Sequence, residues 1–213
     1  MRILVLAAGL GTRLRPLTVQ MPKPLVRVVD KTILECQVEL AKTIPEAHLH
    51  VNAHYLSDQL SKAALSYGFE KVWEEQPEPL GTGGPLYRMN REDPVDELLV
   101  MNSDCFCKFD LRSFLRLSRA SGAPCSLLAV DNPMVNTIYV RDGLMAGIQN
   151  RFGDRTRERV TFSGISWYSK RALENIRENE LDIREFWKRL VLSGNAPFID
   201  VSQKFSLWID MGT

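Results

Sequence analysis

The sequence has little net charge and no long apolar run, and each absence excludes a class of protein. Its 213 residues include 27 basic and 26 acidic side chains, so the formal net charge is +1. This balance leaves no basic surface for nucleic acid or an anionic membrane. No apolar run approaches the length of a bilayer span, and Arg2 with the short apolar stretch after it does not resemble a signal peptide. We therefore expect no nucleic-acid partner, no membrane association and a cytoplasmic location.

Cysteine and histidine are also scarce. The four cysteines are Cys36, Cys105, Cys107 and Cys125. Their spacing matches no zinc or haem pattern, and we expect them to be reduced because cytoplasmic proteins rarely keep disulfides. His48 and His50 would share one face of a strand. No carboxylate or cysteine lies at ligand spacing near them, which disfavours a metal site there.

The most informative residues lie close to the start of the chain. The apolar run 3–6 has no polar residue to give alternation, which is typical of a buried parallel strand. It leads into Gly9 and Gly11, where the backbone can bend tightly and bring its amides close to a phosphate. Arg13 and Lys23 then add two positive charges. A turn that presents amides together with two cations is suited to a polyphosphate.

The same turn departs from the dinucleotide-binding pattern G-x-G-x-x-G. Gly9-Leu10-Gly11 is followed by Thr12-Arg13-Leu14, so the third glycine, which packs a helix onto the strand, is missing. Pro16 also restricts Arg15 to extended or turn geometry, so the loop is expected to continue to about Pro24. These features disfavour a nicotinamide-dependent oxidoreductase, while a nucleotide remains compatible with the loop.

Apolar periodicity predicts strands and helices that alternate over the first 130 residues. The expected helices are 32–44, 56–67, 82–90, 111–120, 172–179 and 181–192. The expected strands are 3–6, 49–53, 71–74, 97–101, 126–130, 159–168, 198–201 and 205–209, with a hairpin formed by 137–140 and 144–149. This order predicts an α/β fold, with a Rossmann-like, mostly parallel mixed sheet flanked by helices and a small antiparallel hairpin insertion.

Two of the expected helices begin with capping signals. Thr32 with Glu35 three residues later forms a capping box. Thr82 is expected to cap the helix that contains Pro85 in its first turn. The sequence has no linker, repeat or low-complexity segment, so residues 1–213 are interpreted as one domain.

Two aspartates are candidate metal ligands. Asp104 follows the buried strand 97–101, and Asp210 ends the triplet Trp208-Ile209-Asp210. Carboxylates are the hard oxygen ligands that Mg²⁺ prefers, usually together with phosphate oxygens and water. Ligands in open α/β sheets sit beyond the carboxyl ends of the strands, so the glycine turn and the Asp104 loop could meet in one crevice. Either aspartate alone could equally be a solvated residue at the end of a loop.

The stretch LAAGLGTRLRPLT…PKPLV resembles the signature of the sugar-1-phosphate nucleotidylyltransferases, and the resemblance continues through EEQPEPLGTGG, LLVMNSD, TFSGISWY and WIDMGT. Members of this family join a nucleoside triphosphate to a sugar 1-phosphate and release pyrophosphate. TFSGIS and VDNP are most similar to the bacterial N-acetylmuramate-1-phosphate uridylyltransferases. Mannose-1-phosphate guanylyltransferases share much of the same pattern and are the alternative.

The resemblance implies a role for each site residue. It places Arg13 and Lys23 among the catalytic residues and Asp104 and Asp210 on Mg²⁺. The implied nucleotide-binding residues are Ala7, Ala8, Gly9, Gly11, Thr12, Gln76 and Gly81. The implied sugar-binding residues are Asn136, Ser163 and Gly164. Gln76 could read a base edge through its amide, or it could be an ordinary surface residue.

The sugar side is the least defined part of the sequence. Many family members carry a Glu-Lys-Pro motif on the hairpin, and it is absent here. Four arginines cluster in its place: Arg151, Arg155, Arg157 and Arg159. One of them could replace the missing lysine, although runs of charge are usually solvated. The loop 131–138 is also shorter than in the uridylyltransferases. The sequence does not determine the base, the sugar or the oligomeric state.

Two further points follow from the resemblance. A sugar-nucleotide sensor without activity would be expected to have lost Arg13, Lys23 or an aspartate, and none is lost. The chain ends at Thr213, directly after the Asp210 motif, where family members continue into at least one more helix. Either the chain is a fragment, or the missing cover leaves the Asp210 loop mobile.

Overall fold

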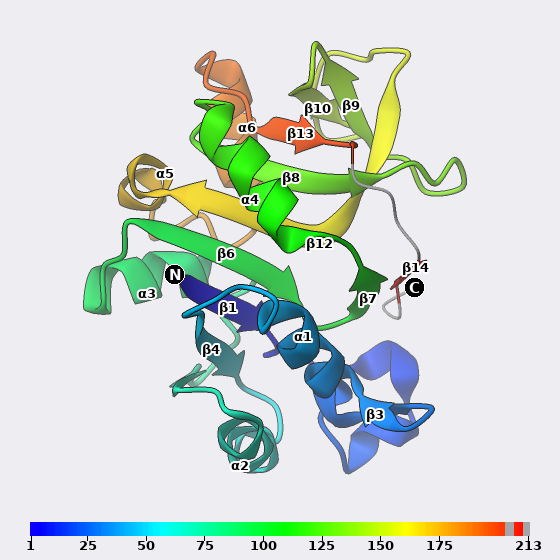
Figure 1. The fold of residues 1–213 in the computed structure, drawn as a ribbon, viewed down its shortest axis with the longest axis vertical. Coiled ribbons are helices and arrows are strands. Elements are labelled where there is room, and N and C mark those ends of the chain that lie inside the picture. Colours follow the sequence, from blue (N-terminus) through cyan, green and yellow to red (C-terminus); the bar gives the residue numbers. More distant parts are fainter. Residues whose placement is uncertain (203–206, 211–213) are drawn as a thin grey trace.

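A ten-stranded mixed sheet forms the centre of the computed structural model, which describes residues 1–202 and 207–210 (Figure 1). Its strands are β1 (Arg2–Leu6), β4 (His48–Ala53), β5 (Lys71–Glu74), β6 (Glu97–Asn102), β8 (Cys125–Val130), β9 (Ile138–Arg141), β10 (Leu144–Ile148), β11 (Phe152–Gly153), β12 (Arg159–Ser169) and β13 (Phe198–Asp200). Their order is β11-β10-β13-β8-β12-β6-β1-β4-β5, and β9 pairs with β10 and β12.

Most strands at the centre of the sheet run in one direction. β5, β4, β1 and β6 pair in parallel, and β13 pairs with β8 in parallel. β12 lies antiparallel to both β6 and β8, so β8 again points the same way as β6. The α/β fold with a mostly parallel mixed sheet is therefore confirmed, as is the β9–β10 hairpin. The central, antiparallel position of β12 was not expected, because alternation predicts a strand but not its direction.

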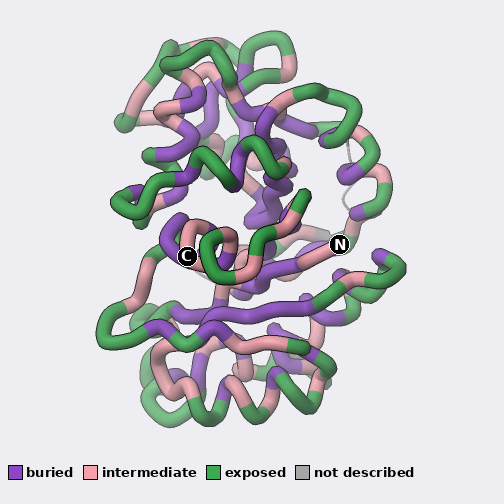
Figure 2. The backbone as a smooth tube through the Cα atoms, turned by 90° about the vertical axis from the view of Figure 1, so that its left-hand side faces the viewer, coloured by how far each residue is buried: buried purple, intermediate pink, exposed green. Residues whose placement is uncertain are grey.

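Helices cover both faces of the sheet. They are α1 (Ile33–Ala41), α2 (Ser57–Tyr67), α3 (Gly84–Glu92), α4 (Leu111–Ala120), α5 (Lys170–Asn175) and α6 (Ile183–Leu192). Leu4 faces the core beneath α3, α5 and α6, whereas Ile3 and Val5 face the core beneath α1, α2 and α4. The central strands β1, β6, β8 and β12 therefore supply both cores. Figure 2 shows buried stretches inside the molecule and exposed stretches on its outer turns.

The helix ends confirm one capping prediction and correct another. Thr32 and Glu35 form the expected capping box, with the Glu35 amide 3.1 Å from Thr32 Oγ1. The prediction that Thr82 caps α3 is wrong, because the N-cap is Gly83 and no side chain caps that helix. The Thr82 hydroxyl instead accepts from the Ile183 amide at 3.0 Å, at the start of α6.

The two expected helices after β12 are shorter than predicted. α5 ends at Asn175 because Ile176 is extended, so the prediction of a helix to residue 179 is wrong. α6 begins at Ile183 rather than residue 181, because the Asp182 carboxylate accepts from the Arg184 amide and fixes the N-cap there.

A small separate sheet lies at one end of the large one (Figure 1). β7 (Cys105–Lys108) pairs antiparallel with β14 (Leu207–Asp210), and Cys105 lies opposite Asp210. A second pair joins β2 (Arg27–Val28) and β3 (Lys31–Thr32). The expected strand 205–209 is seen as 207–210, and its first two residues lie outside the described part. β7 and its pairing were not expected from the sequence.

The remaining expectations concern cysteines and membranes. All four cysteines are free thiols, as expected, and three of them are buried. Among the described residues, no helix combines the length and apolarity needed to span a bilayer.

Candidate active site

The loop between β1 and α1 folds back on itself through three short 3₁₀ turns, Thr12–Leu14, Leu17–Val19 and Lys23–Leu25. Gly11 has φ +64, and a Cβ there would lie 3.0 Å from Thr18 Cγ2. The fully buried Thr18 donates from its hydroxyl to the Gly11 carbonyl at 2.6 Å, which holds the turn closed. As expected, no α-helix follows the glycines directly. The anchoring role of Thr18 was not foreseen.

A cavity of about 450 Å³ lies over the carboxyl ends of β1 and β6, between this loop and the turn that follows β6. The expected residues that line it are Ala7, Ala8, Gly9, Gly11, Thr12, Arg13, Lys23, Gly81 and Asp104. The glycine turn and the Asp104 loop therefore meet in one crevice. A cavity of this size and position is typical of a small-ligand site in an α/β fold.

Lys23 and Asp104 contact each other on the cavity wall. The distance from Lys23 Nζ to Asp104 Oδ2 is 3.0 Å, and the two side chains are 12% and 31% exposed. Arg13 is exposed at the cavity mouth and forms no ion pair in the part of the chain that the structure describes. One cation is thus fixed by a carboxylate, and the other is free to turn toward a ligand.

Asp104, Cys105 and Asp210 form a cluster of potential metal ligands, with one ligand atom from each lying within 4.8 Å of the others. The pairing of β7 with β14 brings Asp210 to this position. Burial, together with the neighbouring carboxylates, strongly raises the pKa of the Cys105 thiol, which donates to Asp104 Oδ1. The available donors are therefore two carboxylates, and this donor set fits a hard cation such as Mg²⁺.

Ser163 and Gly164, the expected sugar-binding residues on β12, lie beneath this cluster and do not line the cavity. The strand bulges here, Gly164 has φ +93, and a Cβ on Gly164 would lie 2.6 Å from Cys105 Sγ. The Ser163 carbonyl accepts from Trp208 Nε1 at 3.1 Å. Both residues support the aspartates from below, and contact with a sugar stays a prediction.

The loop 76–83 forms the wall opposite the glycine turn. Gln76 is exposed and outside the cavity lining, whereas Gly81 and Thr82 line it. Gly81 has φ +72, and a Cβ on Gly81 would lie 2.4 Å from the Leu181 carbonyl oxygen. The amides of Thr82 and Gly83 both donate to that carbonyl at 2.8 Å. The segment before α6 therefore braces this wall.

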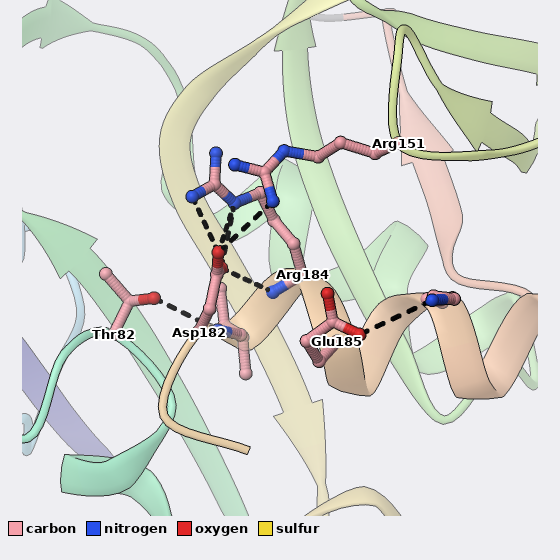
Figure 3. Close-up of polar contacts among 7 residues, drawn as sticks. Thr82, Arg151, Asp182, Arg184 and Glu185 are labelled. Atoms are coloured by element: carbon pink, nitrogen blue, oxygen red, sulfur yellow. Dashed lines mark hydrogen bonds and ion pairs between the residues drawn. The ribbon is translucent and has the colours of Figure 1, made fainter.

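Two arginines converge on Asp182 beside Thr82 (Figure 3). Arg184 Nη2 lies 2.6 Å and Arg151 Nη1 lies 3.4 Å from Asp182 Oδ2. Burial alone would raise the pKa of Asp182, but the hydrogen bonds from Arg184 outweigh it and hold the pKa below its ordinary value. Of the arginine cluster that could replace the missing lysine, Arg151 is therefore engaged with a carboxylate near the cavity.

The remaining candidates have structural partners. Asn136 accepts from the Asn132 amide at 3.0 Å and donates to Asp131 Oδ1 at 2.7 Å, so it ties the 131–136 loop together. Its contact with a sugar stays a prediction. His48 contacts Glu70, and His50 accepts from Trp73 Nε1.

Asn52 and Glu75 are among the residues of the site that sequence reasoning missed. Asn52, at the carboxyl end of β4, is 1% exposed, lines the cavity and accepts from the Ala7 amide at 2.6 Å. Its amide also donates to the buried Glu75 at 2.8 Å. The only available signal was an amide side chain inside an otherwise apolar strand end, Val51-Asn52-Ala53.

A glycine turn with two cations, beside paired carboxylates at the carboxyl ends of the strands of a mixed sheet, defines an α/β protein with a built small-ligand site. Residues 2–136 match the model of the nucleotidyl transferase family. The chain belongs to that family.

Several known proteins are similar to this chain. The mannose-1-phosphate guanylyltransferase catalytic subunit beta of Xenopus tropicalis is 30% identical over all of this chain and 61% of its own length. Two solved structures share the fold. HddC from Yersinia pseudotuberculosis, complexed with GMP-PN, has a TM-score of 0.74 at 22% identity, covering 100% of this chain and 94% of its own. A putative glucose-1-phosphate thymidylyltransferase from Bacillus anthracis has a TM-score of 0.77 at 18% identity, covering 100% and 90%.

The chain spans about three-fifths of the length of the Xenopus relative, since it covers 61% of it. Other similar curated proteins, such as that of Eremothecium gossypii, are also mannose-1-phosphate guanyltransferases. We expected the chain to be most similar to the N-acetylmuramate-1-phosphate uridylyltransferases. That expectation is wrong, because the relatives named here are mannose-1-phosphate guanylyltransferases.

Proposed function

We propose that this chain transfers a nucleotidyl group from a nucleoside triphosphate to a sugar 1-phosphate and releases pyrophosphate. The observation that carries the proposal is the cavity itself. Gly9, Gly11, Arg13, Lys23 and Asp104 all line it, and Asp210 lies beside Asp104. Membership of the nucleotidyl transferase family supports the same reaction.

The chemistry follows from charge. A sugar phosphate oxygen forms a bond to the α-phosphorus while the bond from that phosphorus to the leaving pyrophosphate breaks. Both reactants are anionic, so their repulsion dominates the barrier, and catalysis requires positioning and neutralisation of charge. A phosphate dianion is already a nucleophile, so a general base is not required.

Each cation has a place in this scheme. Arg13 and the amides around Gly9 and Gly11 neutralise the leaving pyrophosphate, because this turn has the geometry of a phosphate-binding loop. Lys23 lies against Asp104 and contacts the α-phosphate side. Asp104 and Asp210 would hold Mg²⁺, which supplies charge neutralisation to the phosphates when bound.

The substrate pair is proposed to be GTP and mannose 1-phosphate. The relatives that cover the whole chain at 29–30% identity are mannose-1-phosphate guanylyltransferases. The short 131–138 loop and the absence of a Glu-Lys-Pro motif leave the sugar pocket the least constrained part of the proposal.

The test is pyrophosphate release with Mg²⁺ over a matrix of GTP, UTP, dTTP and ATP against mannose 1-phosphate, glucose 1-phosphate and N-acetylmuramate 1-phosphate. Release is expected to be fastest with GTP and mannose 1-phosphate. Fastest release with UTP and N-acetylmuramate 1-phosphate would reassign the substrates. Nucleotide-sugar binding with no release from any pair would instead indicate a sensor.

A further inference from the structure

A buried polar chain connects the two walls of the cavity. The Ala7 amide donates to Asn52 Oδ1 at 2.6 Å, and Asn52 Nδ2 donates to Glu75 Oε1 at 2.8 Å. Glu75 Oε2 in turn accepts from the Leu80 amide at 2.7 Å. Ala7 begins the glycine turn, and Leu80 lies between Pro79 and Gly81 in the opposite wall.

The polar chain formed by Ala7, Asn52, Glu75 and Leu80 is held rigidly. Asn52 and Glu75 are each 1% exposed. The Glu75 backbone is fixed independently, because its amide donates to the Ala53 carbonyl at 2.8 Å. The two donors to the Glu75 side chain, Asn52 Nδ2 and the Leu80 amide, are both neutral. A buried carboxylate that is satisfied only by neutral donors is costly to disturb.

We infer that Asn52 and Glu75 are positioning residues that set the spacing between the phosphate-binding amides and the 79–82 wall. A nucleoside triphosphate reaches both walls, whereas a bare polyphosphate reaches only the glycine turn. The pair therefore controls affinity for the nucleotide more than the rate of the chemical step. This inference rests on the proposed function for the identity of the ligand, but its test requires no transfer reaction.

The hydrogen-bond polarity of the pair offers a sharp test. Asn52→Asp keeps the acceptor for Ala7 but sets a carboxylate against Glu75. Glu75→Gln leaves one acceptor oxygen and replaces the other with an NH₂ group. That NH₂ group must face a second donor, either Asn52 Nδ2 or the Leu80 amide. Each single variant therefore breaks one bond of the chain. The double variant N52D/E75Q reverses the central bond and satisfies every donor and acceptor again.

Binding of GTP and of UTP to the wild-type protein is measured by calorimetric titration with Mg²⁺ and without sugar phosphate. The affinity of the nucleotide that binds more tightly is then compared across the variants. Each single variant is expected to weaken nucleotide binding about tenfold, as for the loss of a buried hydrogen bond. In Glu75→Gln, which adds no negative charge beside the glycine turn, tripolyphosphate is expected to bind within about twofold of wild type, because Ala7 keeps its acceptor. The double variant is expected to return close to wild-type nucleotide affinity.

Two measurements separate positioning from general damage. If transfer is observed, KM for the nucleotide should rise in the single variants while kcat changes little. Glu174→Gln, which removes a charge from the exposed surface of α5 and does not line the cavity, should change nothing and is the matched control.

Three results would overturn the inference: equal weakening of nucleotide and tripolyphosphate in Glu75→Gln, unchanged nucleotide affinity in both single variants, or no recovery in the double variant. If the single variants fail to fold, the double variant decides alone, because a folded double variant with weakened nucleotide binding contradicts the inference. Failure of the transfer assay with intact nucleotide binding would refute the proposed function and leave this inference standing.

Discussion

Asp104 contacts Lys23 directly and has the Asp210 carboxylate within reach, so one side chain serves two neighbours. If Asp104 holds both Lys23 and a divalent ion, the negative charge of its side chain should matter more than the shape of that side chain. Asp104→Asn keeps the shape and removes the charge. We expect Mg²⁺-dependent pyrophosphate release to fall by about 100-fold or more, the scale of losing one electrostatic stabiliser at a reaction centre.

Release is measured at increasing Mg²⁺, and Asp58→Asn, in the exposed first turn of α2, is the control for loss of a surface charge. Unchanged release by the Asp104 variant at every Mg²⁺ concentration would remove both the metal assignment and the role given to the contact with Lys23.

His50 gives a prediction about stability. It is 4% exposed and accepts from Trp73 Nε1 at 3.1 Å. Burial, with the nearby positive charge of Arg2, lowers the pKa of His50 from 6.5 to about 4. The unfolded chain therefore binds the proton more readily than the folded chain. The free energy of unfolding should be unaffected above pH 6.5 and should fall between pH 6.5 and about 4, by about 3 kcal/mol in total from this group.

The comparison is with His50→Gln, which keeps an acceptor for Trp73 but cannot titrate. The unfolding free energies of wild type and of this variant are measured in denaturant from pH 7 to 4. As the pH falls, wild type should lose stability relative to the variant. His48→Gln, on the exposed end of β4, should follow wild type. Parallel curves for wild type and His50→Gln would show that His50 is not the group responsible.

At the residue scale, the sequence predicted which glycine and charged residues of the amino-terminal loop line the cavity. It did not predict the polar residues that hold the surrounding loops in place. Gly9, Gly11 and Lys23 were predictable because their spacing is local and chemically restrictive. Thr18 and Glu75 were not, because each acts through a partner that only the folded chain brings near. Gln76 was chosen for its chemistry, yet the loop leaves it exposed and presents Gly81 to the cavity instead.

At the scale of elements, the contact between loop 76–83 and the start of α6 makes two glycines differ in a measurable way. A Cβ on Gly83 would lie 2.0 Å from the Glu180 carbonyl oxygen, whereas a Cβ on Gly9 would meet nothing within 4 Å. Gly83→Ala must therefore displace backbone and should lower the unfolding free energy by about 2 kcal/mol or more.

Gly9→Ala should leave the melting temperature unchanged but weaken nucleotide binding, because a methyl group there limits close approach of a phosphate. Thermal melting and calorimetric titration of the two variants provide the check. A stable Gly83→Ala protein would show that the 180–183 segment moves easily and does not brace the cavity wall.

The elements themselves were largely predictable where a single stretch of sequence decides them. Amphipathic periodicity predicted α2 and α4 to within one residue, and the capping box placed the start of α1, which ends three residues earlier than predicted. β7 was missed because its pairing partner, β14, lies about a hundred residues further along the chain, and short strands are stabilised mainly by such non-local partners. The end of α5 was misjudged because the charged residues after Asn175 are compatible with helix but are held in a turn by Glu180.

At the scale of the whole molecule, β12 joins the two halves of the sheet. Along it, Tyr168 faces the core covered by α6, and Trp167 faces the core covered by α4. The strand pairs along its length with β6 and β8, both of which precede it in the chain. Sequence alternation could not reveal this, because it reports which faces are buried but not which strands become neighbours.

This arrangement bears on the proposal that residues 1–213 form one domain. Trp187 donates to Tyr168 in one core, and Trp167 donates to Glu97 in the other, so the cores share the same strand. If β12 couples them, neither core can open alone, and the chain should unfold in one transition. Variants that retain only Trp187 or only Trp167 should report coincident denaturant midpoints by fluorescence, and both should match the far-ultraviolet circular dichroism. Separate midpoints would show that the two cores open independently and would contradict the proposal of a single domain.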